Sequence, residues 1–568
     1  MATLDWLVIG LFVCAMIWIV YSVMKKKQNS SSDYFLSGRD ATWIAIGASI
    51  FASNIGSEHL IGLAGAGASS GMAMAHWEFQ GWMILVLGWV FVPFYERSMV
   101  YTMPEFLERR YNKTSRSILT YISLISYVLT KVSVTVYAGG LVFQQVFGID
   151  SVHWFGTDID FFWIAAIGLV LITALYTVVG GMESVLKTSV LQTPILLLGS
   201  LFILYLGFKA LSGMGEGSGW QQMMEICGAT PVNEYGDKMT QLMRNNGDPN
   251  YPWFGALGGS IIIGFWYWCT AQFIVQRVLS GKNEKEARRG TILGAYFKLL
   301  PVFLFLIPGM IAFALASKNY PGFAQVLGNG DVAFPTLVRE LLPAGVKGLV
   351  VCGILAALMS SLASLFNSSA MLYTIDVYKR RHPETEEKKL VKVGRVATVV
   401  IVILGILWIP IMKGIGDVLY LYLQDVQSVL APGIAAAFLM GICWKRTTPQ
   451  GGQWALISGL VIGLTRLAAK IIYTTSWGES LGSSLFRSVF YDYNWLFFCV
   501  WMLAFCLIVC VVVSLCTKPK SEEELKGLVF STATPEQKEA TRRSWNKWDI
   551  FHSAVILGLT VAFYIYFW

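Results

Sequence analysis

The segment Ala52-Ser53-Asn54-Ile55-Gly56-Ser57-Glu58-His59 lies inside a long apolar stretch, at about residues 42–71. Serine, asparagine and glycine are mediocre to poor helix formers, and a carboxylate and an imidazole are costly at the depth of a bilayer. Backbone that leaves the helix inside a membrane is tolerated only where it is buried in protein or lines a wet cavity. We therefore expect a broken helix with a functional site. A kink whose polar groups satisfy one another between packed helices would give the same pattern.

The composition around this segment is that of a polytopic membrane protein. The 568 residues are 55% hydrophobic and 14% charged, whereas soluble domains carry about 25% charged residues. A membrane-spanning helix needs about 20 apolar residues, and we expect fourteen such helices in a single all-α membrane domain, residues 1–568. The expected spans are 4–24, 41–70, 72–96, 117–147, 161–180, 185–210, 254–278, 289–317, 346–375, 393–412, 418–441, 452–474, 493–516 and 549–568.

The positions of lysine and arginine predict the orientation of these spans. When the loop of Lys25, Lys26 and Lys27 is placed in the cytoplasm and the other loops alternate from there, most of the 43 lysines and arginines fall on the cytoplasmic side. Both termini then lie outside. We expect a multi-pass protein of the plasma (inner) membrane. The net charge of +8 is explained by this topology and does not imply a nucleic-acid partner.

Other polar groups also lie inside the apolar stretches. Tyr267 and Trp268 belong to an aromatic cluster midway along a span, which is too deep for an interfacial belt. A flat apolar face with a polar tip suits the C–H face of a sugar ring, although core packing is a real alternative. Lys298 is close enough to the inner surface to snorkel, and the serines after Ser360 could serve close helix packing. Each signal is therefore weak when taken alone.

The second and seventh spans are both broken or weakened, and they are five spans apart. This spacing is typical of an inverted repeat of five plus five helices that holds its substrate where the breaks meet. Residues 41–210 would form the first repeat and 254–441 the second. Residues 4–24 would be an extra N-terminal helix, and 452–568 would hold three extra helices. An enzyme is not expected, because the sequence has no nucleotide-binding loop, metal cluster or credible nucleophile–base pair.

Several motifs along the chain form a recognisable set: residues 47–57 with His59, Trp89-Val90-Phe91-Val92-Pro93, Met103-Pro104-Glu105-Phe106-Leu107, Trp266-Tyr267-Trp268-Cys269-Thr270, Ser360-Ser361-Leu362-Ala363-Ser364 and Trp444-Lys445-Arg446. With these motifs, the chain resembles the sodium/glucose cotransporters of the solute:sodium symporter family, from about residue 33 to 520. The resemblance implies the leucine-transporter fold with fourteen helices, and sodium-coupled symport of a glucose-like or galactose-like hexose by alternating access.

The resemblance also implies site residues, position by position. The polar groups of the sugar site match Asn54, His59, Glu78, Lys298 and Gln424, with Tyr267 stacked on the sugar ring and Trp268 beside it. The sodium (Na+) site matches the carbonyls of Ala52, Ile55 and Ala357 and the hydroxyls of Ser360 and Ser361. Apolar residues of the outer gate match Leu63, Trp77 and Tyr420. Glu58 receives no role. The expected partners are a small sugar, sodium and the lipid bilayer.

Departures from the family pattern limit these expectations. Ser189 and Ala363 replace an aspartate and a threonine of relatives that bind two sodium ions, so we expect one sodium per sugar. Relatives also carry polar or acidic residues at three positions where this chain has none: Gly264, Ala271 and Leu421. Mannose, fructose and myo-inositol therefore remain open as substrates, as does a sugar sensor or sodium channel on the same scaffold.

Overall fold

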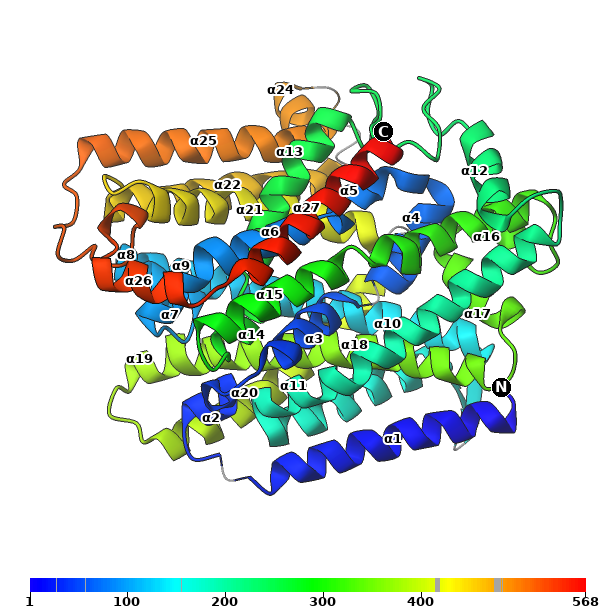
Figure 1. The fold of residues 1–568 in the computed structure, drawn as a ribbon, viewed down its shortest axis with the longest axis horizontal. Coiled ribbons are helices and arrows are strands. Elements are labelled where there is room, and N and C mark those ends of the chain that lie inside the picture. The colour runs from blue at the N-terminus through cyan, green and yellow to red at the C-terminus, as the bar shows by residue number, and fades with distance from the viewer. Residues whose placement is uncertain (27, 57, 155, 414–418, 474–481, 483) are drawn as a thin grey trace.

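The computed structural model describes residues 1–568 except 27, 57, 155, 414–418, 474–481 and 483; it also leaves out the side chains of 129–130, 154, 411–413 and 419–423. Almost every element is a helix (Figure 1). This is expected for an apolar chain, because a helix provides hydrogen-bond partners for its own backbone N–H and C=O groups where water is absent. A short antiparallel hairpin of β1 (Ser151–Trp154) and β2 (Thr157–Asp160) is the exception among the described residues.

The helices follow the order of the apolar stretches. The first half holds α1 (Thr3–Met24), α2 (Ser31–Leu36), α3 (Trp43–Asn54), η2 (Glu58–Leu63), α4 (Ala64–Ser69), α5 (Ala75–Glu78), α6 (Gly81–Val86), α7 (Val92–Ser98), α8 (Met103–Arg110), α9 (Lys113–Ser126), η5 (Tyr127–Val132), α10 (Ser133–Phe147) and α11 (Phe161–Ser212). The second half holds α12 (Gly219–Ala229), α13 (Trp253–Gly264), η6 (Phe265–Thr270), α14 (Gln272–Leu279), α15 (Glu284–Lys298), α16 (Ile307–Ser317), α17 (Ala333–Leu341), α18 (Val346–Met371), α20 (Glu387–Lys413), α21 (Leu419–Cys443), α22 (Pro449–Tyr473), α25 (Trp495–Cys516), α26 (Pro535–Arg543) and α27 (Lys547–Tyr566).

Within the described residues, ten helices are long and apolar enough to cross a membrane, or eleven if one bent pair is counted as a span. Differences from the expected fourteen have local causes. The stretch at 41–70 is divided by its break. The stretch at 254–278 is the bent pair. The count of fourteen spans stays a prediction.

The two expected spans at 161–180 and 185–210 form the single element α11, and Gly181 interrupts its helical geometry. Gly181 has φ 54° and ψ −146°, which is outside the helical region. A Cβ atom at this position would lie 2.3 Å from the carbonyl oxygen of Tyr34, so α2 occupies the space beside the glycine. Glycine is needed here for both reasons, since only it adopts such a conformation freely and leaves room for the neighbouring backbone.

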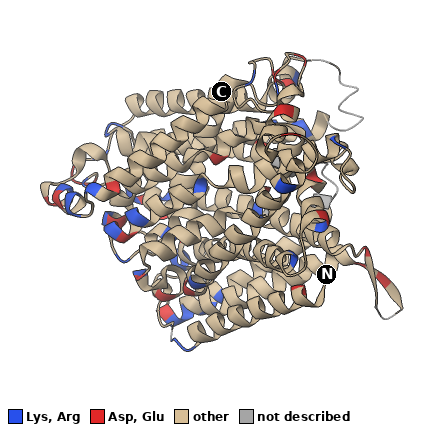
Figure 2. Ribbon diagram, turned by 45° about the vertical axis from the view of Figure 1, so that its right-hand side comes forward, with Lys and Arg blue, Asp and Glu red and all other residues tan. Residues whose placement is uncertain are grey.

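The bundle places the broken helix at its centre. α3 packs against α11, α15 and α18, and Figure 1 shows α1 and α25 at opposite margins of the bundle. Figure 2 shows lysine and arginine gathered mainly at one end of the molecule, away from both termini. The C-terminal segment lies against the long loop before α13, since the Leu242 amide donates to the Phe567 carbonyl at 2.7 Å.

Candidate functional site

The break in the first core helix lies where the sequence places it. α3 ends at Asn54, Ile55 is extended (φ −77°, ψ 112°), and the chain becomes helical again at Glu58. The last carbonyls of a helix have no following amide to accept from, so this end exposes polar backbone inside the bundle. Asn54 and His59, on either side of the break, approach to 3.4 Å between Nδ2 and Nε2. One short segment therefore presents both carbonyls and side chains.

An ion pair stands beside these two residues. Lys298, at the end of α15, lies 2.6 Å from a carboxylate oxygen of Glu78, at the end of α5. His59 Nε2 lies 3.5 Å from the other oxygen of Glu78. Glu78 is 1% exposed and Lys298 is 4% exposed. Because desolvating two charges can cost more than their attraction returns, a buried pair is poor evidence for stability and a reasonable sign of function.

An aromatic wall faces the ion pair. η6 is a wide helical turn that carries Tyr267 and Trp268, whose ring centroids are 4.8 Å apart. The helix then bends by 43° at Ala271, which has extended geometry. The Lys298 ammonium lies 5.3 Å from the Trp268 ring, and that of Lys131 lies 4.4 Å from the Tyr267 ring. The second helix that the sequence predicted to be weakened thus meets the first.

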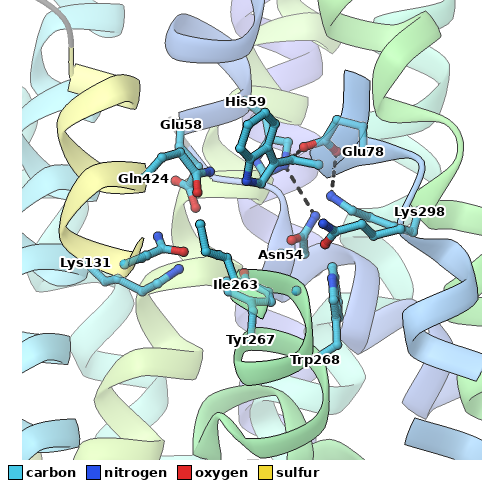
Figure 3. Close-up of a pocket in the computed structure, with 14 residues that line it drawn as sticks. Asn54, Glu58, His59, Glu78, Lys131, Ile263, Tyr267, Trp268, Lys298 and Gln424 are labelled. Atoms are coloured by element: carbon cyan, nitrogen blue, oxygen red, sulfur yellow. Dashed lines mark hydrogen bonds and ion pairs between the residues drawn. The ribbon is translucent and has the colours of Figure 1, made fainter. Parts of the chain in front are cut away.

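These groups enclose one cavity (Figure 3). Its lining includes all seven residues that the sequence assigned to the sugar, and they come from segments spread over most of the chain. The cavity measures about 40 Å³. A water molecule needs about 10–15 Å³ on this measure, so the space holds roughly three waters. A ring with twelve heavy atoms enters only if the walls move apart.

Several polar atoms that line the cavity lack a partner among the described residues. Such atoms are rare in folded proteins, and each one is costly unless a ligand or water satisfies it. They are the Glu58 Oε2, His59 Nδ1, Trp77 Nε1 and Gln424 Oε1 atoms. The set mixes acceptors with the indole donor, and the imidazole nitrogen takes either role, so the cavity suits a ligand that both donates and accepts hydrogen bonds.

The structure adds cavity residues that the sequence left without a role, among them Glu58, Lys131, Gln80 and Gln427. Gln80 fills the space that Gly264 leaves open, since a Cβ atom on Gly264 would lie 2.3 Å from Gln80 Oε1. The Gln80 amide also donates to the Ser260 carbonyl at 2.6 Å.

Lys131 and Gln80 could have been singled out from the sequence, because a charged group or an amide within an apolar stretch indicates a functional position. Asp425, by contrast, forms an ion pair with Lys470.

The residues assigned to sodium are all buried where α3 meets α18: Ala52, Ile55, Ala357, Ser360 and Ser361. Ser189, on α11, lies beside them, with its hydroxyl 3.2 Å from that of Ser360. The Ser189 hydroxyl also donates to the Val185 carbonyl at 2.7 Å. Carbonyl and hydroxyl oxygens are hard, neutral ligands, which suits a monovalent cation without a permanent buried charge. The available oxygens therefore fit sodium.

The three gate residues differ in what the structure describes. Leu63 is fully buried in η2, and Trp77 lines the cavity. Trp77 stacks on Trp495 with centroids 5.7 Å apart and also meets the edge of Tyr251, in the loop before α13. Tyr420 lies in the first turn of α21, but its side chain is outside the described part of the chain. Trp77 is thus placed between the cavity and the loop.

Comparison with known proteins gives consistent matches. A model of the sodium:solute symporter family matches residues 34–459. Human sodium/myo-inositol cotransporter 2 is 38% identical over 531 residues, covering 90% of this chain and 76% of its own. Sodium/glucose cotransporter 4 of Danio rerio is 36% identical over 564 residues, with 95% and 83% covered. The solved structure of a Na+-coupled sialic acid symporter, in a substrate-bound outward-open state, matches with a TM-score of 0.73 at 21% identity, covering 92% of this chain and 99% of that one. This last match shows a shared fold.

Proposed function

Because the chain belongs to the sodium:solute symporter family, it is a sodium-coupled secondary transporter and not an enzyme, and we propose that its solute is a six-membered ring polyol. The unpaired polar atoms around an aromatic wall carry this proposal. Ring hydroxyls both donate and accept, while the C–H face of the ring packs on Tyr267. Glu78, Lys298, Asn54, His59 and Gln424 would bind the hydroxyls.

Two polyol classes fit this site. A hexose of the glucose or galactose type follows from the sugar-site residues, and an inositol is supported equally by the names of the similar relatives. Gln80, which occupies the space beside Gly264 and directly precedes α6, supplies an amide from a different segment of the chain than the family pattern does. Because this exchange moves a hydrogen-bonding group, it changes which ring position is recognised and keeps mannose and fructose as further candidates.

We further propose that one sodium ion enters with each solute, bound by the carbonyls of Ala52, Ile55 and Ala357 and the hydroxyls of Ser360 and Ser361. Ala52 and Ile55 lie on the same broken segment as Asn54 and His59. Sodium would order the backbone that positions the solute-binding side chains, and the solute would in turn raise sodium affinity by the same factor. The small cavity supports a cycle in which the walls part on alternate sides.

The arrangement of the bundle supports a topology for this cycle. We propose fourteen spans, with residues 41–210 and 254–441 as inverted repeats, in the plasma membrane. The basic end of the molecule would face the cytoplasm, and both termini would lie outside (Figure 2). Leu63, Trp77 and Tyr420 would close the outer side of the site.

Purified protein in liposomes tests the solute class. Uptake of labelled glucose, galactose, mannose, fructose and myo-inositol is measured with an inward sodium gradient and with potassium in its place. At least one ring polyol should accumulate only with sodium, and unlabelled competitors should rank the others. If none of these polyols is taken up by liposomes that show sodium-dependent uptake of another solute, the proposed solute class is wrong.

Three variants test the site. Tyr267→Ala removes the aromatic wall, Lys298→Ala leaves Glu78 without its ion-pair partner, and Gln424→Ala removes an unpaired acceptor. Each should raise the half-saturating solute concentration by about five- to hundredfold, since one lost buried interaction is worth about 1–3 kcal/mol. Normal transport by both Lys298→Ala and Gln424→Ala would contradict this map of the site.

A further inference from the structure

Glu58 is a buried carboxylate to which the sugar-site assignment gives no role. It lies in the first turn of η2, is 7% exposed and lines the cavity. Its carboxylate folds back over the helix break, because a Cβ atom on Gly56 would lie 2.3 Å from Glu58 Oε2. That oxygen has no hydrogen-bond partner among the described residues. An ionised carboxylate accepts hydrogen bonds and cannot donate them, so this atom lacks a donor.

Lys131 is a second buried charged residue on the same side of the cavity. It is 6% exposed, and its ammonium lies 4.4 Å from the Tyr267 ring and 4.8 Å from the Phe273 ring. Glu58 and Lys131 line the same cavity and also a second, narrow space beside Ser361. They place a carboxylate and an ammonium on the same side of the cavity, with the Oε2 atom of Glu58 left without a partner among the described residues.

The two carboxylates face the cavity from different sides. Figure 3 shows Glu58, Lys131 and Gln424 on one side and Glu78, Lys298 and Asn54 on the other, with Tyr267 and Trp268 between them at the aromatic wall. Glu78 is already paired with Lys298 at 2.6 Å, whereas Glu58 retains a free oxygen. A ligand lying on the aromatic wall would meet one carboxylate at each edge of its ring.

We infer that Glu58, on the same side of the cavity as Lys131, is a second hydroxyl-recognition site of the same cavity, and that it determines which ring polyol is accepted. This inference rests on the proposed function. The ring edge that faces Glu58 must carry a hydroxyl, because a ring oxygen or a C–H group there offers no proton. The accepted class is thus a cyclic polyol with hydroxyls at opposite ring positions, as inositols carry at every ring carbon.

Deoxy analogues measure this recognition directly. Inhibition of uptake is compared for the best monosaccharide or inositol of the panel and each of its monodeoxy derivatives, in the full-length protein. Wild type should disfavour one deoxy isomer at Glu58 by about five- to hundredfold, the range expected for one unpaired buried polar group. Glu58→Met removes the acceptor and keeps the volume. It should weaken binding of the parent and leave binding of that isomer unchanged, so their ratio approaches one.

Two further variants keep the test decisive. Glu58→Gln retains a weaker, neutral acceptor and should give an intermediate ratio, which also decides the matter if Glu58→Met is not produced in the membrane. Glu78→Gln should alter the ratio for a different deoxy isomer. Sodium half-saturation is recorded in parallel, because Glu58 and Lys131 also border a narrow space shared with Ser361.

The outcomes separate recognition from structure. A purely structural role of Glu58 would lower affinity for the parent and all deoxy isomers by one factor, and that result would overturn the inference. Unchanged ratios in both Glu58 variants would overturn it as well. Failure of every ring polyol to compete in wild type would instead contradict the proposed function, so the two failures are distinguishable.

Discussion

Single residues set the chemistry of the cavity through the charges they bury. Glu78, Lys298, Glu58 and Lys131 all line a space of about 40 Å³ inside a predominantly apolar bundle. Glu78 and Lys298 are tolerated because they form an ion pair, and removal of one member leaves the other uncompensated. The oxygens proposed for sodium are neutral, but Glu58 and Lys131 border a narrow space that Ser361 also lines. The charged residues of the solute cavity therefore reach the neighbourhood of the proposed cation site.

Ser361 tests the cation region. Ser361→Ala should raise the half-saturating sodium concentration by about five- to thirtyfold, since one oxygen ligand of five is lost at a cost of roughly 1–2 kcal/mol. Solute affinity at saturating sodium should change little. Sodium-dependent uptake in liposomes gives both quantities.

Ser369→Ala is the matched control for this prediction. Ser369 belongs to the same helix and the same stripe of hydroxyls, is fully buried, and its oxygen has no hydrogen-bond partner among the described residues. Its removal should leave sodium dependence unchanged. Equal shifts in the two variants would argue against the assignment of Ser361 to sodium.

Elements of this protein depend on close approach of backbones as much as on apolar side chains. α16 packs on α4 at Gly309, where a Cβ atom would lie 1.9 Å from the Ala64 carbonyl oxygen. In a membrane the hydrophobic effect does not favour contact between helices over contact with lipid, so helices associate through close packing. Small residues at the interface permit that close approach of the backbones. α4 continues the broken helix, so this contact holds the segment that carries the site.

Gly309→Ala should therefore destabilise the protein although alanine is the better helix former. The obstructing atom belongs to the backbone, which cannot rotate away, and overpacking commonly costs about 1–3 kcal/mol. Thermal unfolding in detergent, followed by size-exclusion chromatography, should show a lower midpoint.

Gly168→Ala controls for helix propensity in this comparison. Gly168 lies within α11, and a Cβ atom there would meet nothing within 4 Å. This variant should be as stable as wild type or slightly more so, since alanine exceeds glycine by up to about 1 kcal/mol per helical residue. Equal midpoints for the two variants would contradict the packing argument.

The whole molecule converts a sodium gradient into a solute gradient, and its capacity depends on the number of ions. A tenfold sodium gradient provides about 1.4 kcal/mol, and 100 mV adds about 2.3 kcal/mol per charge. One sodium then supports a solute ratio of several hundredfold. Ser189 and Ala363 provide no carboxylate or second hydroxyl for another ion.

The charge moved per solute should accordingly be close to one. Parallel measurement of solute uptake and charge movement in voltage-clamped liposomes or oocytes gives this ratio. A relative with two sodium sites, assayed in the same way, should give a ratio near two. The same value for this protein would contradict a single sodium.

Topology is a property of the same scale. In a background without the nine native cysteines, a cysteine added after Trp568 should react in intact cells with a maleimide that does not cross membranes. A cysteine at Lys538, in the segment before α27, should react only after permeabilisation. The reverse pattern would place both termini inside.

Much of this protein is predictable from sequence because the relevant forces are local. Apolar length and the weak helix propensity of residues 52–59 are properties of short segments, and such properties located both helix breaks. The cost of burying Glu78 or Lys298 marked these residues as unusual, whereas the set of site residues came from the family resemblance and stays a prediction. The hairpin after α10 and the continuation of α11 through Gly181 were not predicted. Both depend on backbone geometry, and the geometry at Gly181 also depends on contact with a distant segment, α2.

Only the tertiary structure decided which buried groups meet. Gln80 entering the space at Gly264 and His59 reaching Glu78 are contacts between segments far apart in the sequence or separated by a turn, and no local pattern encodes them. The size of the cavity is decided in the same way. The sequence by itself determined where a helix had to break and which charges needed a partner, because both follow from the chemistry of the bilayer. The packing of the bundle chose the partners, because that choice depends on distances across the fold.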